Sequence, residues 1–235
     1  MRHTYKAFDA ELEAIRTGVL NMGGLVEQQL QRAIAALGDD VSAGDAMDAV
    51  GATEAQVNAA QIVIDQQCMQ IIARRQPTAI DLRTILTVTK IVNDLERVGD
   101  EAKKIAYKAA ATRGSNRLTQ VRYLEVTRAA NQSRAMLQTA LDSFARLDLA
   151  GAIEVVARDE EIDAMFHSIM RQLISYMMED PRTISPALEI VFIAKSIERI
   201  GDHATNIAES VVQMVKGKDV RHATAEEIRA EVDQR

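Results

Sequence analysis

Apolar residues recur every three or four positions over long stretches of this chain, and this spacing constrains its fold more than any other feature. In the first stretch the series runs from Phe8 to Leu37 in steps of four or three. A period near 3.5 residues places such side chains along one stripe of a helix. Five further stretches have the same spacing, and breaks rich in Gly, Pro or polar residues separate most of them. The sequence therefore predicts six long helices.

The composition agrees with an all-α chain and excludes other classes of protein. The chain has 235 residues with only three Pro, and aromatic residues make up 3% of it, which is too few for a typical β-sandwich or base-stacking surface. A net charge of −6 argues against binding to nucleic acid. The single cysteine, Cys68, excludes an internal disulfide and fits a reducing compartment. No apolar run has the length of a membrane span or of a signal-peptide core, so we expect a cytoplasmic protein.

The predicted helices fall into two sets of three that are related in sequence. Residues 96–106 align with residues 198–208, with seven of eleven positions identical, and residues 53–58 align with residues 158–163. Such a repeat indicates duplication of one structural unit. We therefore predict two tandem three-helix bundles, at residues 1–113 and 117–222, followed by a polar, solvated tail at residues 223–235 that is either helical or frayed.

Both repeats carry acidic residues spaced four positions apart. These pairs are Glu96–Asp100, Asp159–Asp163 and Glu198–Asp202, and the matching position in the first repeat is Glu54–Asn58, where one charge is lost. Residues four apart lie on one face of a helix. On a helical wheel the pairs of the third and sixth helices lie at the edge of the apolar arc. Each bundle is therefore expected to gather carboxylates from two helices at one shoulder of its core.

Carboxylates gathered in this way repel one another and need either a cation or full contact with water. Oxygen ligands suit Mg, Mn or Fe, and a histidine ligand adds Zn, so His203 beside Asp202 favours the second bundle. The simpler interpretation is an ordinary solvated helix face, where Arg97 or Arg199 balances the acids. The basic segment at residues 74–83 is similarly either a small anion site or a solvated turn.

Four separated motifs resemble those of the PhoU family, bacterial accessory and regulatory proteins of phosphate transport. The motifs lie at residues 75–83, 94–100, 196–209 and 215–222, and the resemblance covers roughly residues 5–222. It implies two three-helix bundles whose acid pairs hold multinuclear clusters of iron, zinc or another divalent metal. Carried over residue by residue, the metal role falls on Glu54, Asn58, Glu96 and Asp100 in the first half, and on Asp159, Asp163, Glu198 and Asp202 in the second. Asn58 departs from the all-acid pattern.

The resemblance also implies a function. The family acts as a negative regulator of phosphate uptake, through the ATPase of the phosphate ABC transporter and a membrane sensor histidine kinase of the phosphate-starvation response. It implies a homodimeric adaptor that is not an enzyme and that reaches the membrane only through its partners. The residues themselves leave two other functions open. One is a carboxylate-bridged metal oxidase, although its Glu-x-x-His signature is absent, and the other is a plain helical scaffold.

Overall fold

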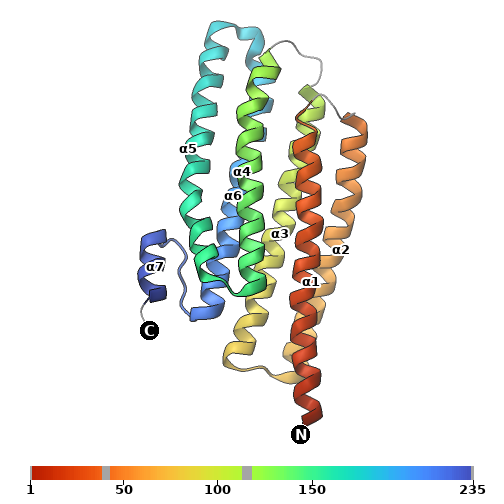
Figure 1. Ribbon diagram of the computed structural model, residues 1–235. Helices are drawn as coiled ribbons and strands as arrows, with labels where there is room; N and C mark the ends of the chain where they lie inside the picture. The colour runs from red at the N-terminus through yellow and green to blue at the C-terminus, as the bar shows by residue number, and fades with distance from the viewer. Residues whose placement is uncertain (1, 39–42, 113–117, 234–235) are drawn as a thin grey trace.

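The computed structural model describes residues 2–38, 43–112 and 118–233, which form two helical bundles side by side (Figure 1). The long helices are α1 (Arg2–Ala35), α2 (Ala43–Arg75), α3 (Ala79–Thr112), α4 (Leu118–Arg146), α5 (Leu149–Glu179) and α6 (Ile184–Lys216). A 3-10 turn η1 (Pro181–Thr183) precedes α6, and a short helix α7 (Ala225–Asp233) follows it. No strand occurs in these described ranges. The predicted all-α fold of two three-helix sets is confirmed, whereas the predicted break at residues 113–117 lies outside the described residues.

Local sequence signals explain where several helices begin and end. Asp148 caps α5, because its carboxylate accepts a hydrogen bond from the backbone N–H of Ala150 at 3.0 Å. Asp180 ends α5, and Pro181 directly after it starts η1. Gly217 ends α6 with a left-handed backbone at φ 77°, and its N–H bonds to the carbonyl of Gln213. These short polar and Gly or Pro residues set the lengths of the helices that carry the acid pairs.

The two bundles pack against each other through α3 with α6 and through α1 with α4, while α2 and α5 lie at the outer edges (Figure 1). The helices α3 and α6 run antiparallel. At one end Arg83 donates to the carbonyl of Met214 at 3.4 Å, and at the other Lys108 pairs with Glu189 at 2.9 Å. The buried apolar residues of both bundles form one continuous core. The two halves are therefore parts of one packed body.

The C-terminal segment is helical, one of the two states predicted for the tail, but it docks on α5 rather than being wholly solvated. Thr224 and Glu227 form a reciprocal cap at the start of α7, each side chain accepting a hydrogen bond from the other residue's backbone N–H at 3.2 and 2.8 Å. Ile228 is fully buried, and α7 contacts α5. The mostly polar composition of residues 223–235 concealed this contact, because one buried residue and its partly buried neighbour Val232 are enough to dock so short a helix.

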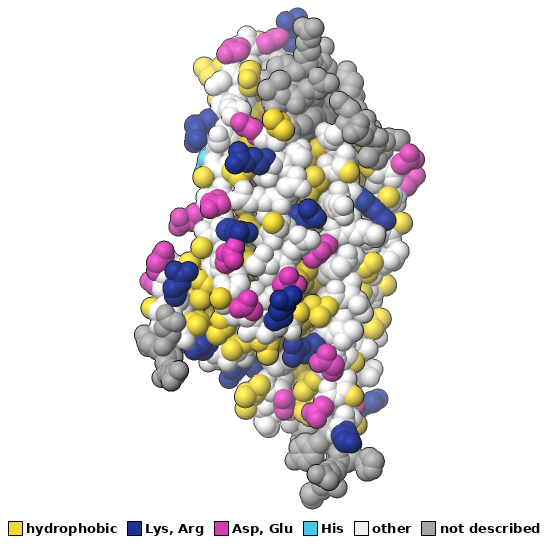
Figure 2. All heavy atoms as spheres, in the orientation of Figure 1, with side chains coloured by type: hydrophobic (Ala, Val, Ile, Leu, Met, Phe, Trp, Pro, Cys, Tyr) yellow, Lys and Arg dark blue, Asp and Glu magenta, His cyan; other side chains and the backbone are white. Residues whose placement is uncertain are grey.

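Charged side chains of both signs are distributed over the surface. Figure 2 shows acidic and basic groups interspersed on the face formed by α1, α4 and α5, rather than one sign gathered into a basic face. None of the described helices combines the length and the apolar content needed to cross a membrane.

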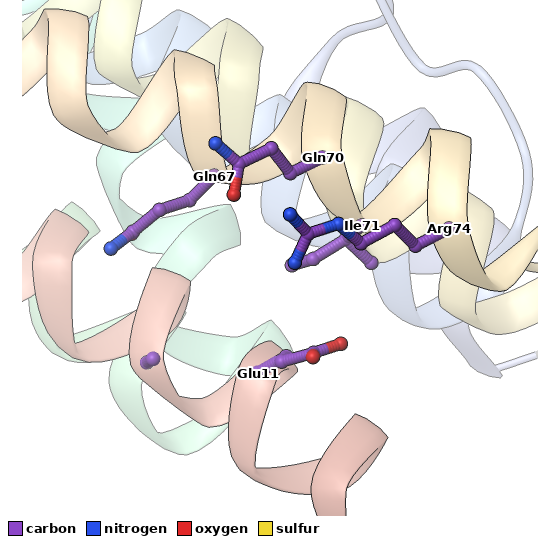
Figure 3. A pocket seen from close by; sticks show the side chains of 6 residues that line it. Glu11, Gln67, Gln70, Ile71 and Arg74 are labelled. Atoms are coloured by element: carbon purple, nitrogen blue, oxygen red, sulfur yellow. The ribbon is translucent and has the colours of Figure 1, made fainter. Parts of the chain in front are cut away.

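The basic segment at residues 74–83 is not one anion site. Arg75 turns towards α1 and pairs with Glu11, with Nη2 2.8 Å from Oε1, and Arg83 turns towards α6 as described above. Arg74 lines a hollow of about 110 Å³ between α1 and α2 (Figure 3), together with Glu11, Gln67 and Gln70. The segment serves contacts between helices, which its sequence alone does not reveal.

We expect Ile228→Asp to release α7 without unfolding the bundles. A carboxylate buried without a partner costs about 3 kcal/mol or more, and Ile228 is the fully buried residue through which this nine-residue helix docks. Hydrogen exchange should become fast in residues 225–233 while α1 to α6 stay protected. Arg229→Ala, at an exposed position of the same helix, is the matched control. Slow exchange of α7 in Ile228→Asp would show that Ile228 does not hold it.

Candidate metal centre

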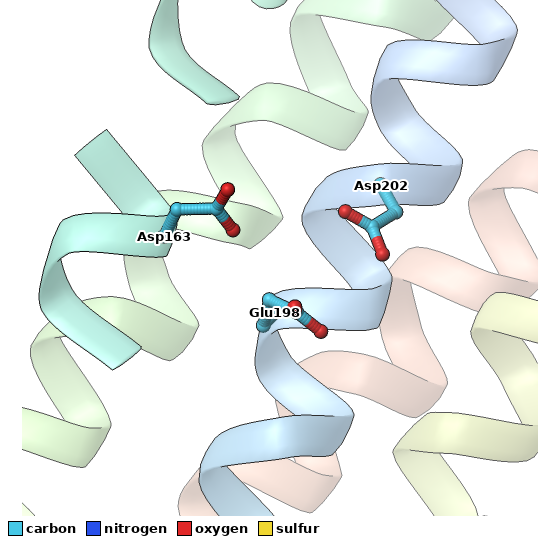
Figure 4. A group of neighbouring side chains, drawn as sticks. All are labelled: Asp163, Glu198 and Asp202. Atoms are coloured by element: carbon cyan, nitrogen blue, oxygen red, sulfur yellow. The ribbon is translucent and has the colours of Figure 1, made fainter. Parts of the chain in front are cut away.

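Three of the predicted acids meet in the groove between α5 and α6. Asp163 extends from α5, and Glu198 and Asp202 extend from successive turns of α6 (Figure 4). One carboxylate oxygen from each lies within 4.8 Å of the other two. Within the described part of the chain, no other group of three or more His, Cys, Asp or Glu side chains comes this close together.

A glycine allows the two helices to approach at this point. A Cβ atom on Gly201 would lie 3.3 Å from Cγ2 of Ile162 on α5, closer than most such contacts. Because Gly201 stands directly before Asp202, and Ile162 directly before Asp163, the close approach brings the acids together. Asp159 lies one turn before Asp163, and its Oδ1 accepts a hydrogen bond from the hydroxyl of Thr205 at 3.1 Å.

The surroundings disfavour negative charge on these carboxylates. Burial raises the pKa of Asp202 to about 6, and the charges of Glu198 and Asp159 add to the rise. Burial also raises the pKa of Asp159, with Asp163 and Glu198 adding to the effect, although the hydrogen bond from Thr205 offsets part of it. A bound cation would oppose both shifts, because a positive charge beside the carboxylates stabilises their ionised form.

Glu198 supplies an independent sign that the group fits a metal ion. Its Oε1 pairs with Lys195 of the same helix. Its Oε2 is buried and has no hydrogen-bond partner among the described residues. A buried carboxylate oxygen without a partner is unfavourable, and carboxylate oxygens are the ligands that Mg²⁺, Mn²⁺ and iron prefer. The residues present therefore fit a cation held by Asp163, Glu198 and Asp202.

The predicted ligands of the first half are arranged differently. Glu54 forms an ion pair with Lys103, with Nζ 2.8 Å from Oε1. Burial raises the pKa of Glu96, with the charges of Asp100 and Glu54 adding to the rise and Arg97 opposing it. The acids of this half are thus near one another, but they do not converge as those of the second half do.

The repeat explains this difference. Glu54 aligns with Asp159, and Lys103 aligns with Thr205. The outer-helix acid is therefore held by an ion pair with the inner helix in the first half. In the second half it is held by a hydrogen bond from a neutral hydroxyl. The Lys103 ammonium supplies the positive charge in the first half, and Asn58 is exposed there.

His203 does not join the carboxylates, so the expectation that it adds a nitrogen ligand to the second-half site is wrong. Its Nδ1 lies 2.9 Å from Oδ1 of Asp94 on α3, and Asn206 donates to the same oxygen at 3.3 Å. Adjacent residues on a helix point about 100° apart, so a side chain next to Asp202 faces the other bundle.

A wider groove extends from the acids towards the C-terminal segment. It has a volume of about 610 Å³, and Asp159, Asp202, Glu209 and His222 are among the residues that line it. Burial raises the pKa of Glu209, while a backbone hydrogen bond from His222 and the charge of its ring oppose the rise. The sequence did not point to His222, because only the folding back of residues 217–224 brings it here.

Comparison with known proteins identifies relatives over nearly the whole chain. The PhoU domain pattern matches residues 19–109 and 126–211, one match in each repeat. The chain is 44% identical over 231 residues to a Pseudomonas aeruginosa protein named phosphate-specific transport system accessory protein PhoU homolog, covering 98% of this chain and 94% of that one. It is 41% identical over 227 residues to the Escherichia coli protein of corresponding name, covering 97% and 92%.

Two solved structures have the same fold. The crystal structure of PhoU from Pseudomonas aeruginosa has a TM-score of 0.83 at 44% identity and covers 90% of this chain and 100% of its own. The phosphate transport system regulatory protein PhoU from Streptococcus pneumoniae has a TM-score of 0.82 at 26% identity, with coverage of 91% and 99%. The six long helices and their packing are therefore shared at low sequence identity.

In the metal-free protein we expect Asp202→Asn to stabilise the fold at neutral pH. The folded-state pKa of Asp202 is about 6, above the ordinary aspartate pKa of 3.8, so its charge destabilises the fold above about pH 6, and this effect is lost as the pH falls towards 3.8. Because the residue is partly exposed, we expect about 1 kcal/mol, or about 2–4 °C in Tm, at pH 7.5 in a chelator. At pH 4 the gain should nearly vanish. Glu226→Gln, exposed on α7, is the control, and an equal gain for Asp202→Asn at both pH values would contradict the assignment.

Proposed function

The chain belongs to the PhoU family, and we propose that it is a regulatory accessory protein that limits phosphate uptake when phosphate is plentiful. The observation that carries this proposal is the near-full-length similarity to proteins named for the phosphate-specific transport system. The matching fold of a protein titled a phosphate transport system regulatory protein supports it further.

In this proposal the protein is a cytoplasmic adaptor and has no catalytic role. It contacts the ATPase of the phosphate ABC transporter and a membrane sensor histidine kinase, and it keeps the phosphate-starvation response off. It reaches the membrane only through these partners. Its rigid helices and its interspersed surface charges support such a role, because charge complementarity sets specificity and encounter rate between proteins.

The adaptor holds a metal ion in its second half. Asp163, Glu198 and Asp202 are the ligands, with Asp159 at the edge of the group, and Fe, Zn, Mn and Mg are the candidates. The ion supplies the positive charge that the clustered carboxylates lack. In the first half, where Glu54, Asn58, Glu96 and Asp100 were the predicted ligands, Lys103 supplies that charge.

The protein forms a homodimer in this proposal. Apolar side chains remain exposed at equivalent positions of both repeats. They are Met69 and Leu86 in the first half and Ile174 and Leu188 in the second, between 43% and 61% exposed. Association with a second copy would cover such residues. Light scattering at micromolar concentration tests this, and a mass of 25.9 kDa would contradict it.

Deletion of the gene in the source organism tests the regulatory role. In phosphate-rich medium we expect higher phosphate uptake and higher alkaline phosphatase activity than in the parent strain, and complementation should restore both. Charge reversal at Glu198 and Asp202 should weaken repression if metal binding there supports regulation. Unchanged uptake and starvation-gene expression in a strain without a paralogue would contradict the proposal.

Metal content tests the difference between the halves. The triple variant Asp163→Ala, Glu198→Ala, Asp202→Ala should lose the metal found by elemental analysis and the rise in Tm that added metal gives the wild type. Lys103→Thr should raise the metal content above that of the wild type, because it removes the ammonium that balances the first-half acids. Lys6→Thr, at an exposed position of α1, is the control. Equal metal content in all four proteins would refute both assignments.

A further inference from the structure

A cleft between α3 and α6 gathers basic side chains from both halves of the protein. Arg97 and Lys104 come from α3, and Arg199 and His203 come from α6. The cleft has a volume of about 340 Å³, within the range of small-molecule sites. Arg97 and Arg199 are equivalent residues of the repeat, so the antiparallel packing of α3 and α6 brings the same arginine to the cleft twice.

A buried carboxylate with one unpaired oxygen also lines this cleft. The side chain of Glu101 is only 6% exposed. Its Oε1 accepts hydrogen bonds from Lys104 at 2.9 Å and from Arg199 at 3.2 Å. Its Oε2 is buried with no hydrogen-bond partner among the described residues. An ionised carboxylate can only accept hydrogen bonds. Against the effect of burial, Lys104, the nearby Ser196 hydroxyl of α6 and Arg199 lower the pKa of Glu101, but Oε2 itself still has room to accept a hydrogen bond from a ligand.

Arg97 has donors available for a ligand. It is exposed, and it forms no hydrogen bond or ion pair with any residue in the described ranges. A guanidinium group presents several N–H donors in a planar fork that matches the oxygens of phosphate. The cleft thus offers donors at its rim and an acceptor at its base.

We propose that this cleft binds inorganic phosphate in a protonated form. Arg97 and Arg199 donate hydrogen bonds to phosphate oxygens, and a phosphate O–H donates to Oε2 of Glu101. Lys104 and Arg199 are about half exposed, so these two flexible side chains can move aside to admit the ligand. The inference rests on the proposed role in phosphate regulation, and it names the small molecule that the protein senses.

The acids of the cleft favour an anion that still carries a proton. Asp100 also lines the cleft, beside the proposed metal ligand Asp202, and its charge repels a fully ionised ligand. Sulfate has no proton near neutral pH, so it would leave Oε2 of Glu101 unpaired and facing a negative charge. Sites built to hydrogen-bond a ligand O–H reject analogues that lack it by large factors. We therefore expect phosphate to bind more tightly than sulfate.

Binding in this cleft connects the two halves. One arginine comes from each repeat, so the ligand joins α3 to α6 through its oxygens. A ligand that binds only the folded protein raises its stability, and the rise grows with the logarithm of ligand concentration above Kd. Phosphate should therefore raise the Tm of the protein and slow hydrogen exchange along α3 and α6.

Titration calorimetry and thermal unfolding of the full chain with phosphate or sulfate at pH 7 test the site. We expect sulfate to bind at least tenfold more weakly than phosphate, and Arg97→Ala to weaken phosphate binding at least tenfold. Arg182→Ala, whose side chain is 90% exposed outside the cleft, should bind phosphate as the wild type does. Equal binding of the two anions, or unchanged binding in Arg97→Ala, would overturn the proposal.

Glu101→Gln provides a signature that a purely structural role would not produce. The glutamine amide can donate to an oxyanion, so the preference for phosphate over sulfate should fall at least tenfold. If this variant does not fold, Arg97→Ala still tests the site from an exposed position. O-phosphoserine is the third ligand, and binding of O-phosphoserine without free phosphate would overturn the proposal in favour of a phosphorylated partner. Derepression in the deletion strain without phosphate binding would refute this site and leave the regulatory role standing.

Discussion

The antiparallel packing of α3 against α6 is the contact on which the rest of the structure depends. It joins the two bundles at their centre and brings the equivalent inner helices of the two repeats face to face. Asp94 contacts His203 across this interface, and Glu101 contacts Arg199. In the repeat, Asp94 aligns with Ser196 and Glu101 aligns with His203. At aligned positions of this interface, one repeat therefore has an acid where the other has a serine or a histidine.

Divergence of the two halves is clearest in their electrostatics. Both repeats keep an acid pair on the inner helix and an acid on the outer helix, but the balancing group differs. Lys103 forms an ion pair with Glu54 in the first half. In the second half the uncharged Thr205 hydroxyl donates a hydrogen bond to Asp159. Two differences, Lys103 against Thr205 and Asn58 against Asp163, thus leave the second half with more negative charge and no lysine on its outer-helix acid.

The sequence predicted the parts of this structure that depend on local periodicity. Six helices and two related bundles followed from the apolar spacing, because one stripe per helix must be buried. The spacing of Glu198 and Asp202 also placed them correctly on one helical face. The pairing of His203 with Asp94 was missed, because it depends on how two helices distant in sequence rotate against each other. The docking of α7 was missed because a single residue, Ile228, carries most of its burial.

The continuous core has a consequence for how such a protein arises and unfolds. Buried side chains of α1, α3, α4 and α6 belong to one apolar cluster, so separating the repeats would expose the faces that now join them. Denaturation should therefore be a single cooperative transition of both repeats. An ancestor with one repeat would have buried the same faces by associating with an identical chain about a two-fold axis. In this view the contact between the two repeats corresponds to the subunit interface of an ancestral homodimer whose two chains became one through gene duplication and fusion.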